Sequence, residues 1–337
     1  MSNPTSPESE PVTPRRLLEM AWGYAPPMIL SAAVQNRIFD LLESGPKTAA
    51  EISAQSGASR RGVRAIMNAL TALELLFKDE NERYSLTPES ATFLVRGKPG
   101  FIGGFMQHGD TLIPKWVRLT EIVRSGKPAM AVNQEGDGSE FFESFVEDLF
   151  PIGYPSARAL AGAFPEAKRV LDLAAGSGVW SIPCAQNSKE VRVTAIDWPG
   201  VLSATRRMTE RLGVARQYEF VGGDLGTVDF GSGYDLATLG QILHSEGRAR
   251  SRELLGKVFR ALTPGGTIAI AEFLANDDRS GPPLAMLFAV NMLVNTEEGD
   301  TFTIPEISQW LTEAGFGEVR TMEVPAPSPL ILATRLA

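Results

Sequence analysis

Cysteine and histidine are scarce in this sequence, which has Cys184, His108 and His244 and no others among its 337 residues. A single cysteine excludes an intramolecular disulfide and a cysteine-based metal cluster, and two histidines disfavour a histidine-rich metal site. We therefore predict no metal centre and a reducing, cytoplasmic compartment. Apolar runs are also short, because none approaches the ~20 residues that a membrane span requires.

Charge and length narrow the class of protein further. The chain carries 32 Lys+Arg against 40 Asp+Glu, and this acidic balance disfavours a generally basic nucleic-acid binder. The length exceeds the ~250–300 residues at which single hydrophobic cores stop growing, which predicts two domains. Residues 1–14 are rich in Ser, Pro and Glu, and we predict a disordered tail there.

Residues 15–100 have the pattern of a winged helix. Apolar periodicity predicts one helix through Ile29 to Leu42, a second that Thr48 caps, and a third that begins after Ser59. Two short apolar runs around a polar turn, ending near Leu86, then predict a β-hairpin.

A winged helix suggests DNA binding, with Arg60, Arg61 and Arg64 of the third helix as phosphate and base contacts. Basic and acidic residues are equally numerous over residues 1–100, however, whereas a DNA-reading domain is usually basic. A dimerisation or scaffold module is therefore the favoured interpretation, and we expect no nucleic-acid partner.

Residues 101–164 contain no glycine-rich turn but many aromatic side chains, among them Trp116 and Phe150. Such density is typical of helix packing and also of pockets between domains. We predict a helical linker here that lines a substrate pocket.

Residues 165–337 alternate strands with helices, which predicts a parallel sheet with crossover helices. The strand Val170 to Leu173 runs into a turn whose glycines, Gly176 and Gly178, let a ligand approach the backbone. The next strand ends at Asp197. A carboxylate at that place accepts hydrogen bonds from ribose hydroxyls, and a helix cap is its structural alternative.

Two adenosine cofactors, NAD and S-adenosylmethionine, fit that pattern, and later elements separate them. A third strand ends in Gly222-Gly223-Asp224, which places a second carboxylate at the same edge, suited to the adenine amino group. The chain ends with two strands, 318–324 and 330–335, joined by a Pro-rich turn. A C-terminal hairpin is unlike the sixth parallel strand of a dinucleotide fold, and it predicts the mostly parallel, Rossmann-like α/β sheet of class I methyltransferases.

The order of these motifs resembles a known family. A winged helix, an aromatic helical region and a glycine-turn domain with Asp197, Asp224, Ile242-Leu243-His244 and Ala271-Glu272 are similar to the small-molecule O-methyltransferases typified by plant caffeic acid O-methyltransferase. Bacterial relatives act on polyketides, carotenoids, phenazines and bacteriochlorophyll precursors. The resemblance implies S-adenosylmethionine as cofactor and a homodimer whose N-terminal domain contributes to the partner's substrate pocket.

Methylation of a phenol requires removal of its proton, for which histidine is the natural base. His244 follows the apolar strand predicted over 234–243, and the resemblance places it at the family's catalytic position. Glu272 ends the next strand and is expected to orient the imidazole. A structural histidine, and a salt bridge or helix cap for Glu272, are the alternatives.

Three features depart from the family pattern. Thr301 aligns with a second His-orienting glutamate, for which Asp300 or Glu298 is a candidate substitute. Ser245 stands where the family mostly has Asp, and Glu246-Gly247 replaces a Trp-containing continuation. Ala174 replaces the first glycine of the cofactor turn.

The predicted sites are two sets of residues. Trp198 either packs on the adenosine or packs between helices. The methionines of an apolar helix over 283–294 suit flat aromatic acceptors, and core packing is the alternative for them. The cofactor set is Asp172, Ala174, Gly176, Gly178, Asp197, Trp198, Asp224 and Leu225. The acceptor-pocket set is His108, Trp116, Phe150, Met286, Met292 and Thr301.

The leading hypothesis is a homodimeric O-methyltransferase that acts on a hydroxyl of a small, aromatic acceptor with His244 as general base. One alternative is N- or C-methyl transfer by positioning alone. Another is a ligand-sensing transcription factor with a degenerate methyltransferase domain and a DNA-binding winged helix. An oxidoreductase is disfavoured by Asp224 and the C-terminal hairpin.

Overall fold

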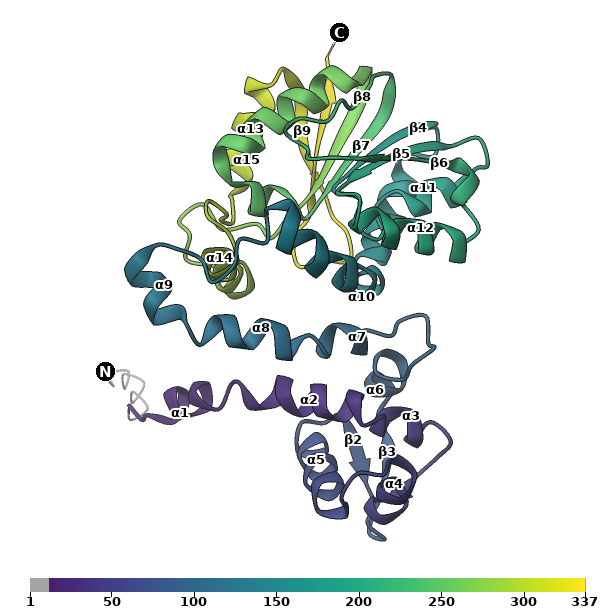
Figure 1. The fold of residues 1–337 in the computed structure, drawn as a ribbon, viewed down its shortest axis with the longest axis vertical. Helices are drawn as coiled ribbons and strands as arrows, with labels where there is room; N and C mark the ends of the chain where they lie inside the picture. Colours follow the sequence, from purple (N-terminus) through teal and green to yellow (C-terminus); the bar gives the residue numbers. More distant parts are fainter. Residues whose placement is uncertain (1–11, 337) are drawn as a thin grey trace, which may run out of the picture. The chain divides into compact units, whose positions relative to one another are not determined.

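The computed structural model describes residues 12–336 and divides the chain into two compact units, residues 1–109 and 110–337 (Figure 1). The predicted tail lies almost wholly outside the described residues. Most of the predicted linker, residues 101–164, belongs to the second unit. Among residues 12–336, no helix combines the length and apolar character that crossing a bilayer requires.

The first unit contains helices and a three-stranded sheet in the order β1–β3–β2. Three helices, α3, α4 and α5, precede the hairpin β2–β3 in the predicted winged-helix order. The elements are α1 (Arg15–Ala21), α2 (Ala25–Gln35), α3 (Ile38–Leu42), β1 (Lys47–Thr48), α4 (Ala49–Ser56), α5 (Arg60–Ala72), β2 (Leu76–Lys78), β3 (Arg83–Leu86), α6 (Pro88–Phe93) and α7 (Gly103–Met106).

The helix starts of this unit follow the predicted capping signals, but one predicted helix is wrong. Thr48 caps α4 in a capping box with Glu51, and the Ser59 side chain accepts the backbone N–H of Gly62. The single helix predicted through Ile29 to Leu42 is instead two helices, α2 and α3. Arg37 between them has a φ of 57°, a left-handed conformation that a continuous α-helix cannot contain.

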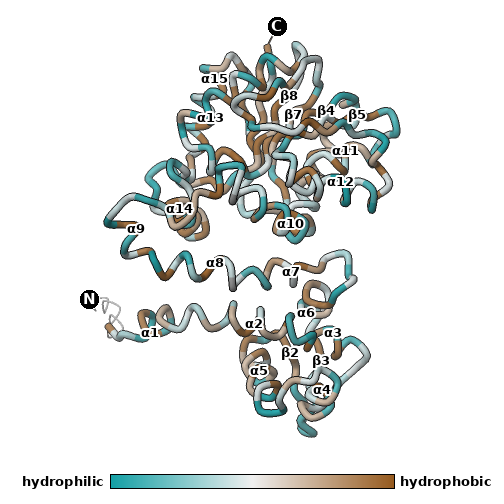
Figure 2. The backbone as a smooth tube through the Cα atoms, viewed as in Figure 1, coloured by the Kyte–Doolittle hydropathy of each residue, from teal (hydrophilic) through white to brown (hydrophobic). Residues whose placement is uncertain are grey.

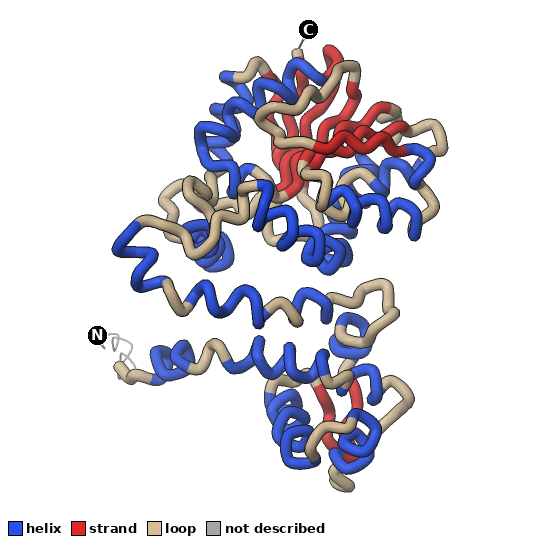
Figure 3. The backbone as a smooth tube through the Cα atoms, viewed as in Figure 1, coloured by secondary structure: helices blue, strands red, loops and turns tan. Residues whose placement is uncertain are grey.

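The second unit holds a seven-stranded sheet in the order β6–β5–β4–β7–β8–β10–β9 (Figures 1 and 3). Strands β4 to β8 are parallel, and β10 pairs antiparallel with both β8 and β9. This confirms the predicted class I methyltransferase sheet. The elements are α8 (Gly109–Trp116), α9 (Leu119–Ser125), α10 (Glu135–Ala163), β4 (Arg169–Leu173), α11 (Ile182–Asn187), β5 (Arg192–Asp197), α12 (Val201–Arg211), β6 (Tyr218–Gly222), β7 (Tyr234–Gly240), α13 (Leu243–Ala261), β8 (Leu262–Ala271), α14 (Pro283–Asn295), α15 (Ile304–Glu313), β9 (Phe316–Met322) and β10 (Leu330–Arg335), with a short 3₁₀ helix at Ala215–Gln217.

The sheet is buried on both faces, as parallel strands require. Successive strand residues alternate between two apolar clusters: Leu171 packs with residues of α13 and α15, whereas Val170 packs with residues of α10, α11 and α12. The strands β7 and β8 are correspondingly hydrophobic (Figure 2). Helices on both faces hold the sheet rigid, which fixes the positions of its strand ends.

Strand β7 ends earlier than predicted. The apolar run suggested a strand over 234–243, but the strand stops at Gly240 and Gln241 turns the chain with a φ of 63°. His244 is therefore the second residue of α13 rather than an extension of the strand.

Candidate active site

The candidate site residues lie where parallel strands end. Asp197 is the last residue of β5, Asp224 follows β6 by two residues, and Glu272 directly follows β8. His244 lies at the start of α13, just after β7. Because the strands are parallel, their carboxyl ends meet at one edge of the sheet, where open α/β folds bind ligands.

His244 and Glu272 form a buried pair at this edge. The imidazole Nδ1 lies 2.7 Å from Glu272 Oε2, and the other carboxylate oxygen accepts the His244 backbone N–H at 3.3 Å. The two side chains are 11% and 3% exposed. Because a carboxylate can only accept, Nδ1 carries the hydrogen, and the lone pair of the neutral ring is on Nε2. The pair thus presents a base nitrogen held in one orientation.

Two phenylalanines surround the imidazole. The ring of Phe288, from α14, meets the His244 ring edge-on with 4.8 Å between centroids. Phe273 lies 6.4 Å from the imidazole and 4.1 Å from Phe288. The imidazole is therefore bordered by an apolar, aromatic surface, which suits a flat apolar molecule.

The glycine turn is tied to the end of β5. Asp197 accepts the backbone N–H of Gly176 at 2.8 Å through one carboxylate oxygen and that of Trp198 at 2.7 Å through the other. Burial raises the pKa of Asp197 to about 6, although both hydrogen bonds favour its charged form. Each oxygen keeps a second lone pair for a ligand donor.

The turn itself has left-handed backbone at three positions. Gly176 and Gly178 have φ values of 55° and 74°, which glycine adopts without strain. Ala174, at the position where the resemblance expects glycine, has a φ of 51°. An alanine in this conformation costs roughly 1 kcal/mol, so the turn is tolerated rather than favoured at that residue.

Asp172 lies beneath the turn rather than at its surface. Its carboxylate is 1% exposed and accepts hydrogen bonds from the hydroxyls of Ser181 and Thr238. Burial raises its pKa to about 7. The side chain braces β4 against β7 and the residues after the turn, so its predicted contact with a cofactor stays a prediction.

Two other residues of the cofactor set pack into the protein. The Trp198 ring lies against Phe142 of α10, at 6.5 Å between centroids, and a Cβ on Gly138 would meet it at 2.8 Å. Leu225 belongs to the main apolar cluster. The structure shows packing of Trp198 against α10, and its predicted contact with the adenosine stays a prediction.

The remaining residues fit an adenosine-bearing cofactor. The glycine turn exposes backbone at the sheet edge, Asp197 retains acceptor capacity there, and the Asp224 side chain is 35% exposed. These are a close-approach turn and two hydrogen-bond-accepting carboxylates at neighbouring strand ends, the set that the sequence predicted for ribose and adenine. Among residues 12–336, no cluster of three or more His, Cys, Asp or Glu side chains is arranged to hold a metal ion.

The predicted acceptor-pocket residues differ in burial. Phe150, Met292 and Thr301 are buried, and the Thr301 hydroxyl has no hydrogen-bond partner in the described part of the chain. Trp116 and Met286 are half-buried, and His108 belongs to the first unit. Their assignment to a pocket stays a prediction.

Sequence reasoning did not assign Phe273 and Phe288 to the base, nor Glu246 and Arg250 to the site. Phe273 adjoins Glu272 in the sequence, which is a signal that was available. Phe288 has no such signal, because its position depends on how α14 packs.

Comparisons with known proteins agree with this geometry. Residues 155–317 match the family described as the O-methyltransferase domain, and residues 18–96 match the O-methyltransferase dimerisation domain.

Three similar proteins cover nearly the whole chain. The 3-hydroxy-5-methyl-1-naphthoate 3-O-methyltransferase of Streptomyces sahachiroi is 32% identical over 93% of this chain and 92% of its own. The tetracenomycin polyketide synthesis 8-O-methyl transferase TcmO of Streptomyces glaucescens is 30% identical over 96% and 97%. The structure of human N-acetylserotonin methyltransferase in complex with S-adenosylmethionine superposes with a TM-score of 0.84 at 25% identity, covering 98% of this chain and 99% of that one.

The raised pKa of Asp197 predicts pH-dependent cofactor binding. If Asp197 accepts hydrogen bonds from the ribose hydroxyls as the sequence predicts, protonation near pH 6 reduces its acceptor capacity, and the affinity for S-adenosylhomocysteine should fall by up to about tenfold per pH unit below the pKa. Calorimetric titration from pH 8 to pH 5 measures this. Asp197→Asn should bind more weakly with a flatter profile, and a wild-type affinity that is constant across this range contradicts the assignment.

Proposed function

The chain belongs to the S-adenosylmethionine-dependent small-molecule O-methyltransferases, and we propose that it methylates a phenolic hydroxyl of a small aromatic acceptor with His244 as general base. The observation that carries this proposal is the buried His244–Glu272 pair with Phe288 against the imidazole.

In the proposed mechanism, His244 Nε2 takes the acceptor's proton while the acceptor oxygen bonds to the methyl carbon. S-adenosylmethionine, when bound, would supply that methyl group from a sulfonium, which provides its own neutral thioether leaving group. Glu272 holds Nδ1–H, keeps the ring in the reactive orientation and stabilises the imidazolium that forms. A deprotonated nucleophile that is held in line with the methyl group needs little further catalysis, so the chain contributes chiefly orientation and exclusion of water.

Holding the cofactor is assigned to the turn and the two strand-end aspartates. Asp197 would accept hydrogen bonds from the ribose hydroxyls, and Asp224 would accept one from the adenine amino group. The backbone around Gly176 and Gly178 would lie against the ligand. Their positions at the ends of β5 and β6 and after β4 support the assignment.

The aromatic character of the acceptor is inferred from the residues around the base. Phe273 and Phe288 offer ring surfaces beside His244. The names of two relatives, a naphthoate 3-O-methyltransferase and a tetracenomycin polyketide 8-O-methyl transferase, point to the same acceptor class.

We assign residues 15–100 to homodimerisation, 101–164 to the acceptor pocket and 165–337 to cofactor binding.

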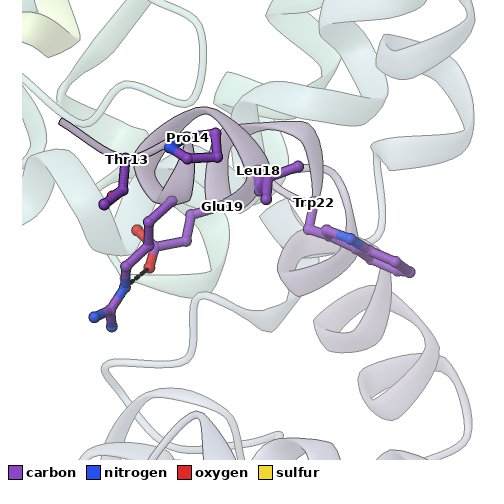
Figure 4. A pocket seen from close by; sticks show the side chains of 6 residues that line it. Thr13, Pro14, Leu18, Glu19 and Trp22 are labelled. Carbon is purple, nitrogen blue, oxygen red and sulfur yellow. Dashed lines mark hydrogen bonds and ion pairs between the residues drawn. The ribbon is translucent and has the colours of Figure 1, made fainter.

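No residue of helix α1 is buried by the described part of the chain, although a seven-residue helix is marginal without packing. Leu17, Leu18, Met20 and Trp22 are each more than 60% exposed. Leu18 and Trp22 line a shallow hollow together with Thr13, Pro14, Arg15 and Glu19 (Figure 4). Several exposed apolar side chains in a region that matches a dimerisation domain fit contact with a second copy of the chain.

His244→Gln tests the base. We expect turnover of hydroxylated naphthoates at pH 7.5 to fall at least about 100-fold, with S-adenosylhomocysteine affinity within about twofold of wild type. The deficit should shrink toward pH 10, near the ordinary pKa of a phenol, because a phenolate needs no base. Methyl transfer is followed by mass spectrometry, with Glu253→Gln on the same helix as control. Undiminished turnover in the variant, or transfer only to amines or carbon, contradicts the proposal.

Phe288→Ala tests the aromatic surface. Loss of a ring contact worth about 0.5–1.5 kcal/mol should raise the acceptor KM by about 3- to 10-fold and leave cofactor affinity unchanged. Leu287→Ala, an exposed position next to it on α14, is the matched control. Equal KM values for both variants would remove the support for a stacked acceptor.

Charge on α1 should dissociate the dimer. Wild type is expected at about twice the 36.4 kDa of one chain by light scattering after gel filtration. Leu18→Asp with Trp22→Asp should give a single-chain mass, because two buried unpaired carboxylates are costly at an apolar interface. Phe77→Ser removes another exposed apolar side chain of the same unit and should leave the dimer intact. A dimeric double variant would place the interface elsewhere.

A further inference from the structure

The residues after His244 include an acid with an unusual environment. Glu246 stands where the family resemblance expects a Trp-containing continuation, and it is 8% exposed. Burial raises the pKa of Glu246, whereas the neighbouring Arg250 guanidinium opposes that shift. A carboxylate in this position needs a cationic partner to stay charged.

Arg250 joins that acid to the predicted adenine site. Its Nε lies 2.6 Å from Glu246 Oε2, and its Nη2 lies 3.2 Å and 3.3 Å from the two carboxylate oxygens of Asp224. One rigid guanidinium therefore contacts two carboxylates, one on α13 and one in the loop after β6. The planar fork of arginine suits such a bridge better than the point charge of lysine.

Helix α13 is kinked at Gly247, which lies in the sequence between the paired residues Glu246 and Arg250. Gly247 has φ 72° and ψ 173°, which interrupts α13 between Glu246 and Arg250. A Cβ at this position would lie 2.6 Å from the backbone oxygen of Glu298, so only glycine fits. The first turn of α13, which carries His244 and Glu246, thus has its own orientation, and the Arg250–Glu246 ion pair spans the kink.

The bridge leaves Asp224 able to bind a ligand. Oδ1 accepts the Gly226 N–H at 2.8 Å in addition to Arg250, whereas Oδ2 has, within residues 12–336, only the Arg250 contact. A carboxylate oxygen has two lone pairs, so Oδ2 retains one acceptor site. Because the Asp224 side chain is partly exposed, that site is accessible to a ligand.

We propose that Arg250 is a positioning residue of the cofactor site, which is anchored by Glu246 and holds the Asp224 carboxylate in the orientation that accepts the 6-amino group of adenine. The inference rests on the proposed assignment of Asp224 to adenine. Without the bridge, Asp224 rotates freely at a partly exposed position, and binding the amino group then costs side-chain entropy. Arg250 thereby sets the preference for a 6-amino purine over a 6-oxo purine.

Binding measurements with two ligands test this role without turnover. S-adenosylhomocysteine carries the amino group, and S-inosylhomocysteine carries an oxygen that a carboxylate repels. Wild type should prefer the amino ligand by at least about 30-fold in Kd by calorimetry, since a site built for a donor rejects an analogue that lacks it. Arg250→Met should weaken S-adenosylhomocysteine about tenfold and reduce the preference to below about fivefold. Arg250→Lys should lie between these values.

Two further variants separate positioning from a general loss of structure. Glu246→Gln with Arg250→Met removes both charges, so it folds without an unpaired buried carboxylate and should show the same reduced preference. Arg252, also on α13, forms an exposed ion pair with Glu313 of α15, and Arg252→Ala should keep the wild-type preference.

The outcomes distinguish this inference from the proposed function. If Asp224→Asn reduces the preference but the Arg250 variants keep it at the wild-type value, Arg250 has no positioning role. If Asp224→Asn itself retains the full preference, the adenine assignment of Asp224 is wrong, and the inference fails with it. Failure of the His244 experiment with an intact Arg250 effect overturns only the base.

Discussion

The cost of burying carboxylates at one edge of the parallel sheet organises the second unit. Asp172, Glu246 and Glu272 are nearly inaccessible, and each has a different class of partner: two hydroxyls, a guanidinium and an imidazole. An unpaired charge there would cost several kcal/mol, so each partner is required by the fold before it has a role in chemistry. The partners also fix where each carboxylate points. The same hydrogen bonds that make burial tolerable therefore orient the groups assigned to the cofactor and to the base.

The sequence predicts the parts of this edge that depend on strand ends. The residues that follow parallel strands lie along one edge of the sheet. Four of them can be recognised in the sequence because each comes at or just after the end of a short apolar run: Asp197, Asp224, His244 and Glu272. The Arg250 bridge is different, because it spans a kink at Gly247 that exists only where the backbone of Glu298 approaches α13. No local sequence pattern predicts that close approach of the two backbone segments. Phe288 lies on the apolar helix predicted over 283–294, but its contact with the imidazole could not be predicted, since the packing of α14 decides which of its faces meets His244.

The errors in element boundaries have a related cause. Apolar periodicity continued through Arg37 and through Gln241, yet both residues adopt positive φ and end an element. Neither residue is glycine, the residue type that most readily adopts positive φ, so the sequence does not indicate a turn at these positions. The same applies to Ala174 in the cofactor turn, where a left-handed alanine replaces the expected glycine. Where the capping residue itself carries the signal, as at Thr48 with Glu51, the helix start is predicted correctly. Backbone conformations imposed by tertiary contacts are the ones that pattern alone misses.

The departures from the family pattern change which positions are acidic: Ser245 and Thr301 are neutral where the resemblance expects acids, and Glu246 is acidic where it expects a Trp-containing continuation. In the resemblance, a second glutamate orients the histidine from the segment before α15, but here Thr301 supplies a neutral hydroxyl. A negative charge is nevertheless present, because Glu246 lies two residues from the imidazole and its carboxylate interacts favourably with a charged His244. Glu246 and Asp224 share the Arg250 guanidinium, whereas Glu272 contacts the imidazole itself. Through that one guanidinium, the segment that carries the proposed base is connected to Asp224, the carboxylate proposed to accept the adenine amino group.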